Sequence, residues 1–155
     1  MNKKDLKESQ PVAWKVLSHA LTSKRLSHGY LFAGPQGAPK AQMALLLVQS
    51  LFCEHCDEEG FACQECESCR RIEQEASLDF LWDHAGGIQK GKPLKKKDLD
   101  SFWHGEKIQV SEKEKNSFRI KKDTILSLQD AFAKSAAGQG WQAYMLDEYD
   151  KATPE

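Results

Sequence analysis

Residues 30–41 read YLFAGPQGAPKA, a short apolar run that leads into a turn rich in glycine and proline. The apolar run, Tyr30–Ala33, is typical of a buried strand. Behind the turn, residues from about Lys40 to Phe52 place apolar side chains at helical spacing, which predicts a helix. A strand, a glycine turn and a helix in this order predict the opening half of a parallel α/β unit.

The turn also has the frame of a phosphate-binding P-loop, G-x-x-x-x-G-K-[ST]. It keeps Gly34, Gly37 and Lys40, which are the candidate nucleotide-binding residues. Pro39 replaces the second frame glycine and has no N–H to donate, and Ala41 replaces the hydroxyl that would hold Mg²⁺. The P-loop is therefore degenerate, and taken alone it fits an ordinary strand-to-helix turn better than an ATP site.

Two further strands are predicted, over Asp79–Trp82 and Ala143–Leu146. The second of them ends in Asp147 and Glu148. In an active P-loop ATPase the first acid would hold Mg²⁺ and the second would orient the attacking water. Beside a degenerate loop we interpret them as a vestigial acidic pair, and we expect no catalytic residue.

Helices are also predicted from Val12 to Leu21, with a start at Gln10 and Pro11, and from Ile120 to Ala133. Residues 86–118 are rich in glycine and lysine, which favours an inserted surface segment. A solvated loop is favoured over a DNA-contacting patch, because runs of lysine usually face solvent.

The composition narrows the class of protein. A length of 155 residues points to one domain, or to one domain with a small appended module. The 22 Lys and Arg balance 23 Asp and Glu. This balance argues against nucleic-acid binding through bulk positive charge. The sequence contains neither an apolar run that could span a membrane nor a secretory signal, so we expect a soluble cytoplasmic protein.

All five cysteines lie between Cys53 and Cys69, which in a reducing compartment favours a metal over disulfides. Cys63, Cys66 and Cys69 form C-x2-C-x2-C, and a fourth thiolate from Cys53 or Cys56 would complete a tetrahedron. An iron–sulfur cluster of the ferredoxin type would need another cysteine after Cys69, and none follows. The pattern therefore predicts a structural zinc site.

Together these segments resemble the bacterial clamp-loader AAA+ family of DNA polymerase III, and within it the delta prime branch. The resemblance lies in residues 25–35 (RLSHGYLFAGP), 51–53 (LFC), 63–72 (CQECESCRRI) and 147–153 (DEYDKAT). It implies an incomplete P-loop (AAA+) parallel-sheet domain, with residues 1–155 as its N-terminal part and 53–69 as an inserted zinc module. By family position Cys53 is the fourth zinc ligand and Cys56 a spare; the alternative is Cys56 as ligand with Cys53 buried.

The related gamma/tau motor subunits share the zinc module but have intact phosphate-binding residues, so Pro39 and Ala41 favour delta prime. The resemblance implies a non-hydrolysing subunit that assembles with gamma/tau and delta. DNA contact would come through the complex, a component of the DNA-directed DNA polymerase holoenzyme that acts in replication. The alternatives are an active gamma/tau-like ATPase, and a free-standing zinc module that binds nucleic acid through the lysine-rich segment.

In the family's sheet the first strand is flanked by two strands that lie beyond the position matching Glu155. The resemblance thus implies a chain truncated after the third strand. Because unpaired strands leave backbone N–H and C=O groups without partners, we predict that the isolated chain is marginally stable or needs a partner.

Overall fold

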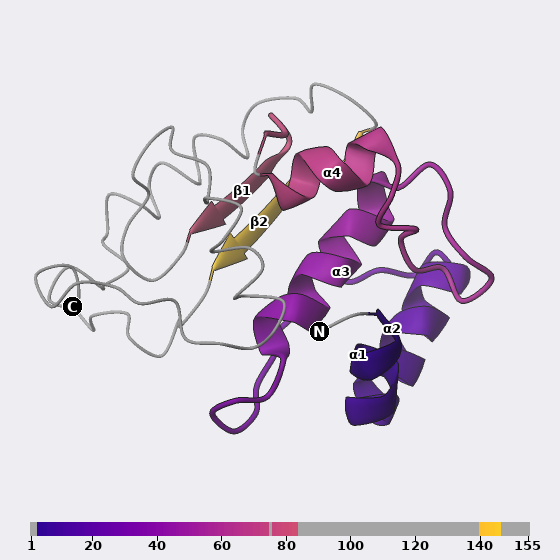
Figure 1. Cartoon of the computed structure of the whole chain (residues 1–155), viewed down its shortest axis with the longest axis vertical. Coiled ribbons are helices and arrows are strands. Elements are labelled where there is room, and N and C mark those ends of the chain that lie inside the picture. Colours follow the sequence, from indigo (N-terminus) through magenta and orange to yellow (C-terminus); the bar gives the residue numbers. More distant parts are fainter. Residues whose placement is uncertain (1–2, 75, 84–139, 147–155) are drawn as a thin grey trace, which may run out of the picture. The chain divides into compact units, whose positions relative to one another are not determined.

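The computed structural model describes residues 3–74, 76–83 and 140–146, which fall into two compact units that are treated separately below. The first unit contains α1 (Lys3–Ser9), α2 (Pro11–Thr22), α3 (Lys40–Phe52) and α4 (Glu67–Glu73). The second contains β1 (Phe80–Asp83) and β2 (Ala143–Leu146) (Figure 1).

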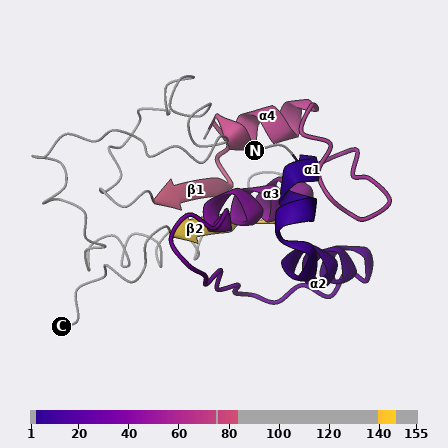
Figure 2. The same ribbon diagram turned by 60° about the horizontal axis from the view of Figure 1, so that its bottom comes forward.

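The helix α3 has the bounds that its apolar spacing predicts. It carries no charged residue after Lys40, and it is buried over most of its circumference. Its buried residues are Gln42, Met43, Leu45, Leu46, Leu47, Val48, Gln49, Ser50 and Phe52. Figure 2 shows α3 between α4 and α2, so it forms the centre of the first unit.

The helix α2 begins at Pro11, as predicted, because proline at the first helical position loses no hydrogen bond. It ends in a Schellman motif around Lys24, whose φ is 54°. The N–H of Lys24 donates to the Leu21 carbonyl (3.2 Å), and that of Arg25 donates to the Ala20 carbonyl (3.1 Å). These bonds satisfy two carbonyls that the helix end would leave open.

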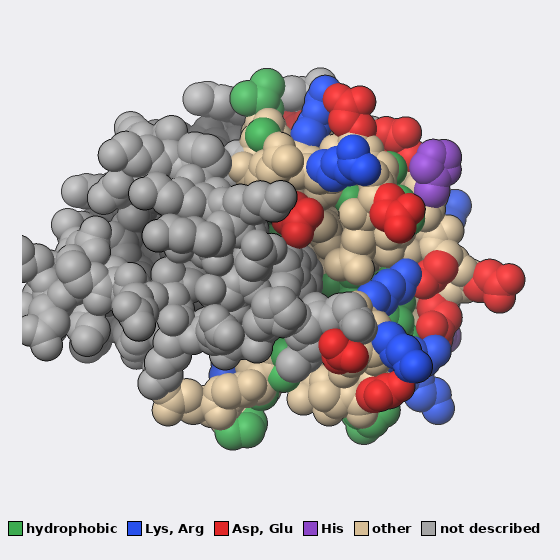
Figure 3. Space-filling model, viewed as in Figure 1, with side chains coloured by type: hydrophobic (Ala, Val, Ile, Leu, Met, Phe, Trp, Pro, Cys, Tyr) green, Lys and Arg blue, Asp and Glu red, His purple; other side chains and the backbone are tan. Residues whose placement is uncertain are grey.

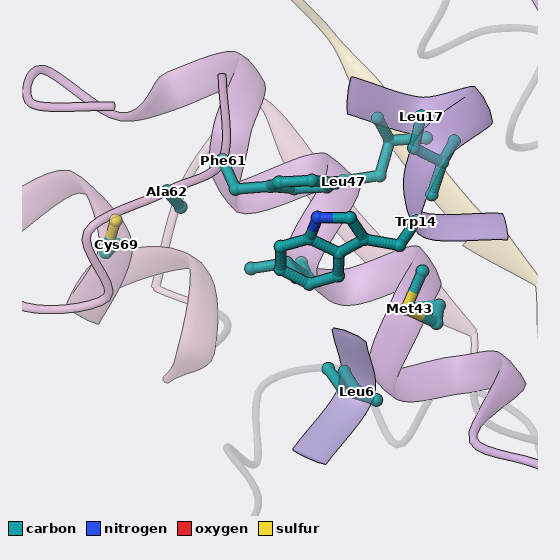
Figure 4. Close-up of a cluster of buried hydrophobic side chains, with 9 residues drawn as sticks. Leu6, Trp14, Leu17, Met43, Leu47, Phe61, Ala62 and Cys69 are labelled. Atoms are coloured by element: carbon teal, nitrogen blue, oxygen red, sulfur yellow. The ribbon is translucent and has the colours of Figure 1, made fainter. Parts of the chain in front are cut away.

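One hydrophobic core joins the four helices to the cysteine-rich segment. The indole of Trp14 on α2 lies at its centre, with its ring centroid 4.0 Å from that of Phe61 (Figure 4). Leu6 of α1 is fully buried in the same core. The other buried members are Leu17, Met43, Leu46, Leu47, Ala62 and Cys69.

The helices α1 and α4 escape sequence analysis. Each has only seven residues, too short for a repeating apolar face. In α4 the buried residues are Cys69 and Ile72. Because Cys69 belongs to the metal-ligand pattern, only Ile72 remains as an apolar signal for a helix.

The predicted strand at residues 30–33 is wrong. Among the described residues, the sheet consists of β1 and β2 alone, and Tyr30–Ala33 has no regular secondary structure. Leu31, expected to be buried, is 85% exposed. A strand requires a neighbour for its backbone groups, and the described part of the chain does not pair one with this segment.

The second unit contains a parallel strand pair, in agreement with the predicted α/β class. β1 pairs with β2 in a register that runs from Phe80 opposite Ala143 to Asp83 opposite Leu146. β1 begins and ends one residue later than the predicted strand Asp79–Trp82, and β2 has the predicted bounds. The N–H of Ala143 also donates to the Asp79 carbonyl (2.9 Å). Phe80 and Trp82 are buried, as are Ala143 and Met145.

Several predictions lie outside the described residues: the segment 86–118, the helix 120–133, and the pair Asp147 and Glu148. Within the described residues, no helix has the length and apolar character needed to cross a membrane.

Candidate metal centre

Four of the five cysteines converge at the end of α3. The sulfur atoms of Cys53, Cys63, Cys66 and Cys69, here called the cysteine cluster, all lie within 4.8 Å of one another. The Cys53 sulfur is 3.6 Å from that of Cys63 and 3.9 Å from that of Cys66. A tetrahedral Zn²⁺ site with Zn–S bonds of about 2.3 Å has sulfur–sulfur edges of about 3.8 Å. The cluster therefore has the dimensions of a four-thiolate site.

Two helix ends and one tight turn place these sulfur atoms. Cys53 follows the last residue of α3, where the backbone becomes extended. Gln64 adopts a left-handed conformation (φ 65°), which turns the chain back so that the Cys66 N–H donates to the Cys63 sulfur (3.3 Å). Cys66 is the N-cap of α4, and its sulfur accepts the N–H of Cys69 (3.5 Å).

Backbone N–H groups also surround the sulfur of Cys53. The N–H groups of His55 and Cys63 both donate to it at 3.3 Å. Such donors favour the thiolate over the thiol, and thiolate is the form that binds metal. The backbone of this segment is thus arranged for negatively charged sulfur.

Hydrogen bonds shift the pKa values of Cys66 and Cys69 in opposite directions. At Cys66 burial alone would raise the pKa, but hydrogen bonds from the backbone of Cys69 and Glu54 and from neighbouring thiols lower it to about 6. At Cys69 burial raises the pKa, and the hydrogen bonds with the side chains of Cys66 and Cys53 raise it further. Cys66 is therefore more readily deprotonated near neutral pH than Cys69.

The fifth cysteine lies outside the cluster. The Cys56 thiol is directed to the carbonyls of Ser50 (3.5 Å) and Cys53 (3.8 Å). Burial and the neighbouring Cys53 raise the pKa of Cys56 to about 11. Of the two candidates for the fourth ligand, the structure thus brings Cys53 and not Cys56 to the other three sulfurs.

Residues 57–62, here called the cysteine loop, connect Cys56 to Cys63 and were not singled out from the sequence. The loop closes on itself through the N–H of Asp57 to the Phe61 carbonyl (2.9 Å) and the N–H of Gly60 to the Asp57 carbonyl (2.9 Å). Gly60 has φ +85°, and a Cβ there would lie 2.8 Å from the Cβ of Leu21. The loop therefore requires glycine both for its conformation and for its contact with α2.

The P-loop-like turn is held by its own lysine. Gly37 has φ +90°, and Pro39 is the N-cap of α3, where it contributes no side-chain cap. The ammonium of Lys40 donates to the carbonyls of Gly34 (3.1 Å) and Pro35 (2.9 Å). The group that would reach a phosphate is thus engaged with the turn itself.

The charged side chains on the described surface are mixed in sign. Figure 3 shows Lys and Arg interspersed with Asp and Glu on the face in view. Several of them pair, as Lys7 does with Glu59 (2.8 Å) and Arg71 with Glu67.

Comparison with known proteins gives the class to which this chain belongs, the subunits of DNA polymerase III. A family profile described as "DNA polymerase III, delta subunit" matches residues 9–155, and the chain belongs to this family. The predicted family is thereby confirmed.

Individual relatives support the same family assignment. The DNA polymerase III subunit delta' of Bacillus subtilis is 29% identical over 150 residues, which cover 97% of this chain and 36% of the relative. The tau subunit of the same organism is 36% identical over 67 residues, 43% of this chain and 12% of tau. A tau/gamma subunit of Haemophilus influenzae is 38% identical over 65 residues, 42% of this chain and 9% of the relative. The chain thus spans 36% of the length of the delta' relative.

Proposed function

We propose that the cysteine cluster binds one structural Zn²⁺ through four thiolates. The dimensions of the cluster support this, as do the backbone N–H groups directed at its sulfur atoms. Four protein ligands leave no open position on the metal, so the ion would fix the fold of residues 53–69 and take no part in chemistry.

The test of the zinc site is a pair of matched cysteine variants. Metal analysis of the purified chain should give one zinc per chain, and Co²⁺ substitution should give the absorption of a tetrahedral tetrathiolate. Cys53→Ser should abolish this spectrum, whereas Cys56→Ser should leave it unchanged. Loss of the spectrum in Cys56→Ser with retention in Cys53→Ser would reverse the ligand assignment.

We further propose that this chain acts as a delta-prime-like, non-hydrolysing subunit of the DNA polymerase III clamp loader. The observation that carries the proposal is the turn at residues 34–41: Pro39 removes a phosphate-binding N–H, Ala41 removes the Mg²⁺ ligand, and Lys40 bonds to the turn. The match to delta' over nearly the whole chain, against less than half for tau, supports the same assignment.

In this proposal residues 1–155 are the N-terminal part of an AAA+-type domain and 53–69 its zinc module. Residues 86–118 are an inserted surface segment, and Asp147 and Glu148 are vestigial. The partners are gamma/tau and delta subunits, and DNA is reached through the assembled complex.

Assembly tests the partner assignment. The chain, mixed at micromolar concentration with gamma/tau and delta subunits, should co-elute with them in size-exclusion chromatography. A chain that elutes alone but binds DNA in a salt-dependent manner would favour the free-standing zinc module instead.

A further inference from the structure

Both backbone polar groups of Ala62, the residue before Cys63, are held by side chains from other elements. Its N–H donates to the hydroxyl of Ser50 on α3 (2.9 Å), and its carbonyl accepts from the ammonium of Lys3 on α1 (3.0 Å). Ala62 is fully buried. The backbone directly before Cys63 is therefore held by hydrogen bonds from both α1 and α3.

Lys3 also reaches the other end of the cysteine loop, where it forms an ion pair with Asp57. The Asp57 carboxylate in turn accepts the N–H groups of Glu59 (3.0 Å) and Phe61 (2.9 Å). One ammonium thus joins the first and last residues of the loop. The Lys3 side chain is only 26% exposed, so these contacts are partly shielded from water.

Two further contacts attach α1 to the same loop. Lys7 pairs with Glu59 (2.8 Å), one turn of helix after Lys3. Between them Leu6 is fully buried in the core that contains Phe61 and Ala62. Lys3, Leu6 and Lys7 occupy one face of α1, at spacings of three and four residues, and all three contribute to holding the loop.

We propose that α1 is a strap that pre-organises the cysteine cluster, and that Lys3 is a positioning residue for the metal centre. The inference rests on the zinc site proposed above. Cys63 directly follows Ala62, the last residue of the loop that α1 holds, so a chain with an intact strap binds metal without first ordering that loop. A chain without the strap must order the loop on binding, and its affinity falls accordingly.

The test compares Lys3→Met with Lys4→Met in the full 155-residue chain. Methionine keeps most of the side-chain length and removes the charge and the donors. The side chain of Lys4 is 82% exposed and its pair with Glu8, at 4.0 Å, is at the limit of an ion pair. Zinc affinity is measured by competition with a chromophoric chelator.

Lys3→Met should weaken zinc binding by about tenfold or more, the usual effect of losing a residue that orients a metal ligand. Lys4→Met should stay within a factor of about two of the unmodified chain. Lys3→Arg, which can still donate to both Asp57 and Ala62, should recover most of the loss. In the metal-free chain, amide hydrogen exchange at Phe61 should become faster in Lys3→Met and not in Lys4→Met.

An unchanged zinc affinity in Lys3→Met, with lower stability of the metal-free and zinc-loaded chains by equal amounts, would overturn the proposal, since α1 would then only stabilise the fold. If the unmodified chain binds no zinc, the zinc site itself is refuted, which is a separate result. Should Lys3→Met not fold, Asp57→Asn gives the same test. Asparagine keeps an acceptor for the loop N–H groups and loses the ion pair, so its zinc affinity should also fall.

Discussion

Cys66 is the N-cap of α4, and its sulfur accepts a hydrogen bond from the N–H of Cys69 (3.5 Å). Although burial opposes ionisation, these hydrogen bonds lower the Cys66 pKa to about 6 from an ordinary value of 9.0. We predict that thiolate absorbance of the metal-free chain shows a step near pH 6 that Cys66→Ser removes. A first step near pH 9 in the folded chain would contradict this.

The same pKa shift has a consequence for stability. A thiol whose pKa is lowered by folding stabilises the folded chain above the unfolded pKa and loses that contribution as the pH falls through the folded pKa. For Cys66 this window runs from 9.0 down to about 6. Cys56 and Cys69 have raised pKa values, so their thiols stay protonated in the folded chain throughout this pH window. The Cys66 contribution to the free energy of unfolding of the metal-free chain should therefore decrease from pH 9 to pH 6, and Cys66→Ser should show a smaller decrease than the unmodified chain.

The backbone conformation of Lys24 leads to a prediction about the stability of the chain. Its φ of 54° is the left-handed conformation at the end of α2, which costs a non-glycine residue about 1 kcal/mol. Lys24→Gly should raise the free energy of unfolding by up to about that amount, measured by urea denaturation. Lys15→Gly, at an exposed position within α2, should lower it by about 1 kcal/mol. Destabilisation by both substitutions would contradict this explanation of the helix end.

The sequence predicts the candidate ligands better than it predicts what supports them. Cys63, Cys66 and Cys69 are recognisable because ligands to one ion recur at a fixed short spacing. Lys3 and Asp57 have no such signature, since their contact joins residues far apart in the chain and depends on the tertiary fold. The choice between Cys53 and Cys56 likewise needs the direction in which the chain leaves α3.

Within the described part of the chain, the cysteine loop requires glycine at one position. Gly60 combines φ +85° with an approach that would bring a Cβ to 2.8 Å from Leu21. Gly60→Ala should therefore lower the free energy of unfolding by about 2 to 4 kcal/mol, since left-handed strain and a clash with α2 add.

Gly37→Ala is the matched control for this loop substitution. Gly37 has φ +90°, but nothing lies within 4 Å of the position of its Cβ. Its loss should be limited to the left-handed strain, about 1 kcal/mol. Equal decreases in the free energy of unfolding of the two alanine variants would show that the close approach of Gly60 to Leu21 does not affect stability.

Helices and strands differ in how far the sequence predicts them. The bounds of α3 follow from thirteen residues with a single charge at the start, a local property. The segment Tyr30–Ala33 has the apolar character of a strand, yet a strand also needs a partner, which no local pattern supplies. The pairing of β1 with β2 shows the same limit, because their register joins residues more than sixty positions apart.

In the first unit as a whole, α1, α2, α3 and the cysteine-rich segment share one core centred on Trp14 and Phe61. The candidate metal site and the P-loop-like turn lie at opposite ends of α3. Under the proposed function, a metal would fix one end of this helix, and the turn at the other end would have the outline of a nucleotide site without binding a nucleotide.

Equilibrium titration of the zinc-loaded chain with a fluorescent ATP analogue and Mg²⁺ tests this account most directly. We expect no saturable binding up to about 1 mM, which corresponds to a binding free energy weaker than about −4 kcal/mol. Lys40→Ala should give the same titration as the unmodified chain, because Lys40 bonds to the turn and not to a phosphate. Saturable binding at micromolar concentration that is lost in Lys40→Ala would contradict the account and assign the chain to the nucleotide-binding members of its class.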